Sequence, residues 1–178
     1  MNLGVNLLLA FLFFAMDPIV LVDFNKTSNS DDWNIVNDVV MGGRSNSQFG
    51  MDSDGHGRFT GAVSLENNGG FCSVQHNLVA KSLGNKKIFS IRIKGDGKQY
   101  QFRVKSNRND YYSYVYQFQT SKQWEVIEIP ISEMYASFRG NKLNIPNYDG
   151  AKIEQLAFLI ANYKQESFEL LIDKIEVK

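Results

Sequence analysis

Polar and apolar residues alternate along several stretches of this chain, and that alternation restricts the folds it can adopt. Residues 89–94 read FSIRIK and residues 100–105 read YQFRVK, so every second side chain is apolar in both. Successive side chains of a β-strand point to opposite faces of a sheet, so each stretch should bury one face and expose the other. On this basis we expect strands at residues 19–24, 59–65, 71–76, 89–93, 100–104, 112–118, 124–129, 156–161 and 168–177.

Turn-forming residues between these strands predict two hairpins. Gly95-Asp96-Gly97-Lys98 separates two alternating stretches, and Asp-Gly suits the positive φ angles of a type I′ turn. A second hairpin is suggested by residues 59–65 and 71–76, which are separated by the Asn- and Gly-rich residues 66–70. Residues 156–161 (LAFLIA) do not alternate, which is typical of a strand covered on both faces.

One segment has helical rather than strand spacing. Ile131, Met134, Tyr135 and Phe138 follow Pro130 at i, i+3, i+4 and i+7, which predicts a helix of at most two turns. Many short strands punctuated by Gly and Asn are typical of an all-β antiparallel sandwich of the jelly-roll kind. The sequence has 178 residues, about the length of one domain. We therefore expect residues 19–178 to form a single jelly-roll domain with one short helix.

The N-terminal segment, residues 1–18, is apolar. Its first 16 residues carry no charged side chain, yet this length is short for crossing a bilayer, which takes about 20 apolar residues. A secretion signal or membrane-associated tail is one interpretation, and an apolar element packed on the domain is the other. The first favours the cell envelope or a membrane surface over the cytoplasm and makes membrane proximity part of the functional hypothesis.

Charge and cysteine content exclude several classes of site. Lys+Arg and Asp+Glu are equal at 19 each, so no net field attracts nucleic acid, and we expect no nucleic-acid partner. The single cysteine, Cys72, allows neither an intramolecular disulfide nor a cysteine-based zinc site. Gly42-Gly43-Arg44-Ser45 does not open onto a helical pattern, so it is not a phosphate loop, and no dinucleotide-binding motif is present.

The residues that could support catalysis or a metal are sparse. Cys72 and His76 lie four positions apart on one predicted strand, about 13 Å at 3.3 Å per residue, which is too far for a dyad. Asp52-Ser53-Asp54 resembles the start of a calcium loop, but His56 occupies its fifth position and Val63 its twelfth. We expect an exposed turn there, with structural calcium as the open alternative. No cofactor, metal or catalytic residue is predicted, and the protein is not expected to be an enzyme.

Aromatic residues concentrate between Tyr111 and Phe118. Tyr112, Tyr114, Tyr116 and Phe118 share one face of a predicted strand. Such a face could stack on sugar rings, or it could line the core with hydroxyls reaching its edge. Only exposed tyrosines would support sugar binding by this strand.

The nine residues NDVVMGGRS, at 37–45, combine turn formers with three consecutive apolar side chains. Asp38 can accept hydrogen bonds from nearby backbone N–H groups, and Gly42-Gly43 can turn where a side chain would clash. We interpret this segment as a shaped corner beside the Asn67–Gly70 turn. The predicted binding residues at this rim are Trp33, Asn37, Asp38, Met41, Gly42, Gly43, Arg44, Asn67, Asn68, Gly69 and Gly70.

Six sequence blocks occur in order at residues 33–45, 61–75, 94–103, 120–130, 139–140 and 168–175. Together they resemble the complex I intermediate-associated protein 30 family, and the resemblance extends over about residues 19–177. It implies a galactose-binding-like jelly roll and a non-catalytic role in assembling respiratory complex I. Because no Arg-rich presequence is recognisable, the chain is expected to be a bacterial-type member of the family.

Two functions follow from this resemblance and from the residues. The first is a non-enzymatic module whose partners are respiratory complex subunits or assembly intermediates. The alternative is a carbohydrate-binding module of the galactose-binding-like fold, with a glycan as its ligand.

Overall fold

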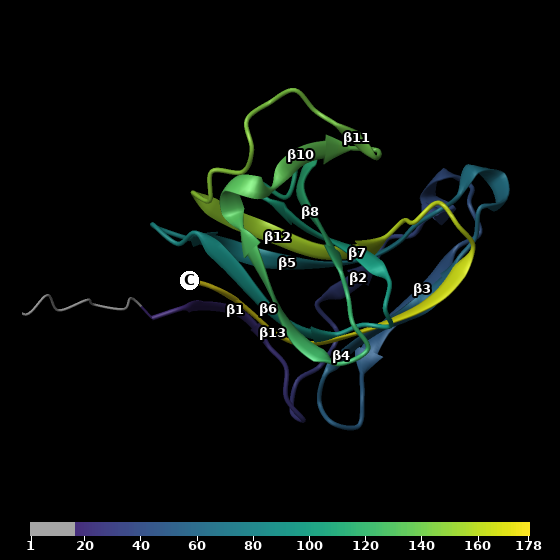
Figure 1. Ribbon diagram of the computed structural model, residues 1–178, viewed down its shortest axis with the longest axis horizontal. Helices are drawn as coiled ribbons and strands as arrows, with labels where there is room; N and C mark the ends of the chain where they lie inside the picture. The colour runs from purple at the N-terminus through teal and green to yellow at the C-terminus, as the bar shows by residue number, and fades with distance from the viewer. Residues whose placement is uncertain (1–16) are drawn as a thin grey trace, which may run out of the picture.

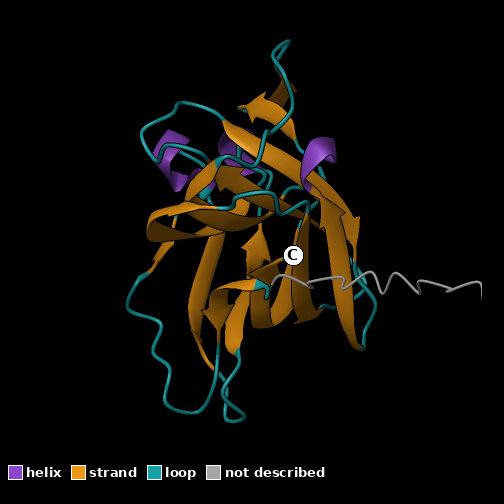
Figure 2. Cartoon of the chain, turned by 90° about the vertical axis from the view of Figure 1, so that its left-hand side faces the viewer, coloured by secondary structure: helices purple, strands orange, loops and turns teal. Residues whose placement is uncertain are grey.

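Two antiparallel β-sheets pack face to face in this protein. A computed structural model describes residues 17–178, so residues 1–16 of the apolar segment predicted at residues 1–18 lie outside the described residues. One sheet has seven strands and the other has six; Figure 1 shows the first above the second, and Figure 2 shows that strands make up most of the regular secondary structure. The expected all-β antiparallel sandwich is therefore confirmed.

The six-stranded sheet has the order β3-β4-β13-β6-β9, and β1 pairs with β13 beyond the end of β4. The bounds of its strands are β1 Ile19–Asp23, β3 Asn46–Met51, β4 Gly57–Val63, β6 Ile88–Lys94, β9 Trp124–Pro130 and β13 Glu166–Val177.

The seven-stranded sheet has the order β11-β10-β8-β7-β12-β5-β2. The bounds of its strands are β2 Trp33–Ile35, β5 Cys72–Ser82, β7 Gln99–Lys105, β8 Ser113–Gln119, β10 Tyr135–Phe138, β11 Asn141–Lys142 and β12 Lys152–Ile160.

The core lies between the two sheets and comes from the apolar set of each alternating strand. Phe89, Ile91 and Ile93 of β6 are fully buried, as are Tyr100 and Phe102 of β7. Residues 156–160 of β12 are all buried, which confirms the strand covered on both faces. On the outer face of β12, Ala157 and Leu159 line the groove described below.

The hairpin predicted at residues 95–98 is wrong, because its two strands lie in different sheets. β6 pairs with β13 and β9, whereas β7 pairs with β12 and β8. Of the four turn residues only Gly97 has a positive φ, so the type I′ geometry does not form. The Thr120 hydroxyl oxygen accepts the N–H groups of Gly97 and Lys98 instead, and the turn crosses between the sheets.

The second predicted hairpin is also wrong. β4 pairs with β3 and β13, whereas β5 pairs with β12 and β2 in the opposite sheet. Between them, residues Glu66–Asn68 form a 3₁₀ turn, η2, in which Asn67 has a φ of 54°. Residues 64–71 therefore cross from one layer to the other.

The helix predicted over residues 131–138 is a short turn followed by a strand. Ile131–Glu133 form a 3₁₀ turn, η3, and Tyr135–Phe138 form β10, which pairs with β8. Its apolar spacing reflects burial of Ile131 and Met134 before the strand begins. In residues 17–178 helix is confined to 3₁₀ turns, and none has the length or apolar character needed to cross a bilayer.

Candidate binding site

The predicted corner at residues 37–45 is organised around the buried carboxylate of Asp38. Asp38 begins a 3₁₀ turn, η1 (Asp38–Met41), and its side chain accepts the backbone N–H of Ser45 at 2.9 Å and the Ser45 hydroxyl. The same carboxylate accepts the N–H groups of Gly70 at 2.6 Å and Phe71 at 3.2 Å. Burial raises the pKa of Asp38, but these hydrogen bonds outweigh it and hold the pKa below its ordinary value.

Glycines make room for this carboxylate. A Cβ atom on Gly43 would overlap the Asp38 carboxyl group, and one on Gly69 would lie 2.6 Å from its Oδ2 atom. Gly42 ends η1 with a φ of 91°, a conformation that side chains rarely adopt. The glycine pairs therefore let two loops close on one buried charge.

Four apolar side chains are exposed on top of this closed corner. Val39, Val40 and Met41 of η1 are 59%, 72% and 54% exposed, and Leu65 beside η2 is 46% exposed. The Asn67 side chain donates to the carbonyl of Gly42 at 3.3 Å, so η1 and η2 lie side by side at one end of the molecule (Figure 1). We call Val39, Val40, Met41 and Leu65 the corner patch.

Of the remaining residues predicted at this rim, some lie at the corner and others line the groove or a separate hollow. Arg44 forms an exposed ion pair with Glu66 at 3.4 Å, and Asn68 lines the groove described next. Trp33 is not part of the corner, because its ring stacks between Phe49 and His76 at 4.6 and 4.9 Å and lines a separate hollow of 280 Å³.

The Asn37 side chain is already used in hydrogen bonds within the fold. Its side-chain oxygen accepts the Ser47 hydroxyl at 2.8 Å and the N–H of Ser73 at 3.4 Å, so it joins three segments of the fold.

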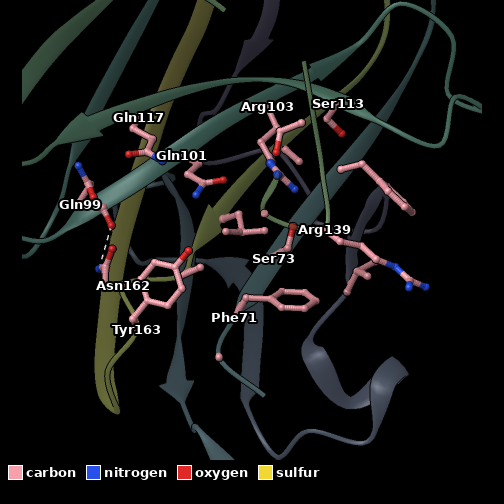
Figure 3. A pocket seen from close by; sticks show the side chains of 18 of the residues that line it. Phe71, Ser73, Gln99, Gln101, Arg103, Ser113, Gln117, Arg139, Asn162 and Tyr163 are labelled. Carbon is pink, nitrogen blue, oxygen red and sulfur yellow. Dashed lines mark hydrogen bonds between the residues drawn. The ribbon is translucent and has the colours of Figure 1, made fainter. Parts of the chain in front are cut away.

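A groove of 810 Å³ follows the outer face of the seven-stranded sheet. That size is typical of small-molecule and cofactor sites. Met41 and Leu65 of the corner patch are among its lining residues, together with Phe71, so the groove adjoins the corner patch. Figure 3 shows Tyr163 and Gln99 toward one side, Arg103 and Ser73 in the middle, and Arg139 on the other side.

The register of the strands explains which side chains form the floor. β7 reads QYQFRVK, and because Tyr100, Phe102 and Val104 face the core, its polar residues face the groove. Arg103 pairs in register with Ala157 of β12 on one side and Val115 of β8 on the other. Ala157 has a small side chain, so it takes little of the space next to Arg103 on this face.

Amides and aromatic rings supply most of the other lining. Amide side chains can both donate and accept hydrogen bonds, which matches hydroxyl groups. The groove is lined by Gln75, Gln99, Gln101, Gln117, Gln119, Gln155, Asn68 and Asn162. Tyr163 and Tyr111 add rings that are 89% and 65% exposed.

The charge of the groove is one-sided. Among the described residues, those lining it include five cations and no carboxylate; the cations are Lys98, Arg103, Lys105, Arg139 and Lys164. Burial lowers the pKa of Arg103, an effect that Tyr135 partly offsets. The Nε atom of Arg103 and the Oε1 atom of Gln101 are buried and have no hydrogen-bond partner within residues 17–178.

The tyrosines of β8 do not form a sugar-stacking face. Tyr114 and Tyr116 are partly buried against the core, and Phe118 belongs to it. The opposite face of the same strand, with Ser113 and Gln117, lines the groove. The sequence interpretation that this face lines the core is therefore confirmed for Tyr114, Tyr116 and Phe118, whereas Tyr112 precedes β8 and is not among the core residues.

The structure also places the residues considered for metal binding and catalysis. Asp52, Asp54 and His56 lie together, with one ligand atom of each within 4.8 Å of the others. Asp52 already accepts the N–H groups of Asp54 and His56, at 2.9 and 2.8 Å, as expected of a turn. Cys72 is fully buried and burial raises the pKa of its thiol to about 12, which opposes nucleophilic chemistry.

Comparison with known proteins identifies the family. The model of the complex I intermediate-associated protein 30 (CIA30) family matches residues 22–172. The chain belongs to the CIA30 family. An uncharacterised Schizosaccharomyces pombe protein is similar to this CIA30 member, with 30% identity over 181 residues, covering 88% of this chain and 83% of that protein.

The mitochondrial complex I intermediate-associated protein 30 of Drosophila melanogaster is 23% identical over 158 residues. This match covers 71% of the present CIA30 chain but 53% of the fly protein, so the chain spans about half the length of that relative.

Solved structures similar to this CIA30 chain include carbohydrate-binding modules. The family 11 module of the cellulosomal cellulase Lic26A-Cel5E of Clostridium thermocellum superposes with a TM-score of 0.67 and 19% identity, covering 92% of this chain and 95% of the module. The Clostridium thermocellum family 11 module in complex with a β-1,3-1,4-mixed-linked tetrasaccharide gives 0.63 and 17%, covering 90% and 94%. These likenesses establish the jelly-roll fold.

Sequence reasoning did not identify the groove. The polar residues of β7 were visible as every second side chain, but a strand exposed to solvent has the same alternation. The signal that distinguishes the groove is the run of Gln, Gln and Arg at 99, 101 and 103 without an acidic residue among the outward positions.

Proposed function

We propose that this protein is a non-enzymatic assembly module that binds respiratory complex I subunits or their assembly intermediates through the corner patch. Membership of the CIA30 family and the name of the Drosophila relative support this role. The observation that carries it is the exposure of Val39, Val40, Met41 and Leu65 on a rigid support.

The corner suits protein recognition because its backbone is fixed before any partner binds. Asp38 ties η1 to Ser45, Gly70 and Phe71, so the apolar side chains are presented on an anchored loop. A preorganised surface loses less conformational entropy on binding, and burial of apolar area supplies the driving force. The neighbouring ion pair of Arg44 and Glu66 gives the patch a polar rim.

Affinity capture from solubilised native membranes tests this function. The wild-type chain should recover complex I subunits, identified by mass spectrometry. Val40→Asp should reduce that recovery at least about tenfold, because a charge at the centre of an apolar contact must be desolvated. Val79→Asp is the matched control, since Val79 is 91% exposed on β5 and outside the corner patch. Capture of no complex I subunits, or equal recovery by Val40→Asp, would contradict the proposal.

A second candidate function is saccharide binding in the groove. It is favoured by the amide-rich lining, by the exposed ring of Tyr163 at one side, and by the likeness to a module solved with a tetrasaccharide. Tyr163→Ala should weaken saccharide binding about fivefold or more if its ring stacks on a sugar, as measured by calorimetry. Tyr111→Ala is the matched variant, because Tyr111 also lines the groove but packs edge-on against Tyr112 and Phe138.

A further inference from the structure

The groove concentrates positive charge in a chain whose charges balance overall. The whole sequence has 19 basic and 19 acidic residues, yet the groove residues described above include five cations and no acid. Two of these cations have acidic neighbours just outside the groove, Lys98 with Asp96 at 2.5 Å and Lys164 with Glu166 at 3.4 Å. The excess positive charge is therefore local to the sheet's middle strands and to the β10–β11 hairpin.

Two guanidinium groups in the groove lack an ion-pair partner among residues 17–178. No carboxylate in this part of the chain lies within salt-bridge distance of Arg103 or Arg139; the Arg139 guanidinium lies over the Phe138 ring, 5.3 Å from its centroid. Lys105 adds to the field at Arg103, and its ammonium group donates to the carbonyl of Asp110 at 2.6 Å. A desolvated charge without a partner is costly, so the floor around Arg103 favours an anion.

The groups around Arg103 specify more than charge. Gln101 precedes it on the same face of β7 and has a buried side-chain oxygen without a partner in the described chain. Gln117 pairs in register with Gln101, and Ser73 lines the same groove. A guanidinium binds a carboxylate in a two-pronged arrangement, whereas amides and hydroxyls match alcohol groups. The arrangement fits a ligand that carries a carboxylate and hydroxyls within one ring.

The strand pairing makes an extended peptide a poorer fit. β7, β12 and β8 are interior strands, so their backbone N–H and C=O groups are already used in the sheet. A peptide lying on this face could not add as a strand, which is how an extended peptide usually satisfies its own backbone. A sugar chain has no such backbone requirement and can use the amide side chains directly.

Two residues at opposite sides of the groove adopt a backbone conformation that is unfavourable for their type. Tyr163 has a φ of 57° and Arg139 a φ of 50°, a left-handed region that Gly and Asn occupy at lower cost. Figure 3 shows Tyr163 and Arg139 with Arg103 between them. Such strain is concentrated at binding sites in proteins. The Tyr163 ring, which can stack on a sugar, and the Arg139 guanidinium thus lie on either side of Arg103.

We propose that the groove binds an anionic oligosaccharide, with the carboxylate of a uronic acid residue held by Arg103 and an adjoining sugar ring on Tyr163. This inference rests on the second candidate function, saccharide binding in the groove, and adds the chemical class of the sugar. Arg139 binds the carboxylate of a further uronic acid residue of the oligosaccharide, and the glutamine side chains bind sugar hydroxyls.

Calorimetry with paired ligands tests the proposal on the full chain. The probes are tetramers of galacturonic, glucuronic and mannuronic acid, each with its neutral methyl ester, together with octaglutamate. At least one acid tetramer should bind about tenfold or more tightly than its ester, as expected for a charge-assisted contact. Arg103→Gln should abolish that difference, and Arg103→Lys should retain part of it. Arg58→Gln is the matched control, because Arg58 pairs with Glu169 on the other sheet.

Each other outcome overturns the inference in a distinguishable way. Equal binding of acid and ester would keep the saccharide function and reject the carboxylate. Failure of every saccharide would reject both, and binding of octaglutamate alone would assign the groove to an acidic protein segment. Arg103→Gln is used only if it unfolds cooperatively like the wild type. If it does not, the proposal is judged on the ratio of acid affinity to ester affinity in the wild type and in Arg103→Lys.

Discussion

The carboxylate of Asp38 accepts the backbone N–H of Gly70 at 2.6 Å and so joins two glycine-rich loops that are 32 residues apart in the chain. Both loops leave one sheet for the other, and the same carboxylate holds the start of β3 through Ser45. The stability of the corner therefore depends on one buried anion, and several predictions about this anion can be measured.

Removing the charge of Asp38 should destabilise the fold. Asp38→Asn keeps the shape but replaces an acceptor of four hydrogen bonds with an amide that must also place two donors. We expect the free energy of unfolding to fall by about 2–4 kcal/mol, measured by urea denaturation. Asp54→Asn, at an exposed turn residue, should change it by less than about 0.5 kcal/mol. Equal effects of the two substitutions would contradict the role of Asp38.

Acid should weaken the fold through the same group. The pKa of Asp38 is below its ordinary value in the folded chain, and so is that of Asp52, whose burial is outweighed by hydrogen bonds from His56 and Asp54. A lowered folded pKa gives stability that is present above the unfolded pKa of about 4 and is lost as pH falls through the folded pKa. Urea midpoints between pH 7 and pH 2 should therefore fall below about pH 4. Asp38→Asn should reduce this pH dependence. If the urea midpoint of the variant fell with pH as steeply as that of the wild type, the assignment to Asp38 would be contradicted.

Gly43 should not tolerate a side chain. A Cβ atom there would overlap the Asp38 carboxyl group, so Gly43→Ala must displace either the loop or the buried anion. We expect a loss of about 2–3 kcal/mol in thermal or urea unfolding. Gly50→Ala is the matched control, because a Cβ on Gly50 meets no atom within 4 Å, and it should be neutral or slightly stabilising. A neutral Gly43→Ala would show that the corner can rearrange.

Cys72 should be inert to thiol reagents until the chain unfolds. Its side chain is fully buried, and burial raises the pKa of the thiol to about 12, so almost no thiolate is present at pH 8. Reaction with an aromatic disulfide reagent at pH 8 should be at least about a hundredfold slower in the native protein than in urea. Fast labelling of native protein would show that the edge of the core near β5 opens readily.

Strand identity followed from the sequence, whereas strand pairing did not. Alternation located β6 and β7 and the faces they bury, because period two directly reports which side chains meet the core. It could not show that the Asp96-Gly97 turn crosses between sheets, since that depends on Asp96 accepting the N–H of Glu169 and on Thr120. These partners are distant in sequence, so a local turn signal is overridden by tertiary contacts.

Local sequence pattern does not predict two of the strands. β3 reads NSQFGM and has little alternation, and in Tyr135–Phe138 the apolar residues continue the helical spacing that begins at Ile131. Both are defined by pairing, β3 with β4 and β10 with β8. The sequence predicts the corner because an Asp followed by paired glycines is typical of a tight turn. It does not predict the groove, because the polar residues of its floor alternate as they would on a strand face exposed to solvent.

The order in which the sheets acquire their middle strands affects how the protein is made. β12 inserts between β7 and β5, and β13 lies between β6 and the strands β4 and β1, yet among the described strands these two are synthesised last. Until then both layers have exposed open edges, which can pair with other chains. Nascent chains of this protein should therefore need protection from aggregation until translation has passed residue 177, and truncation before β12 should abolish folding of both layers together.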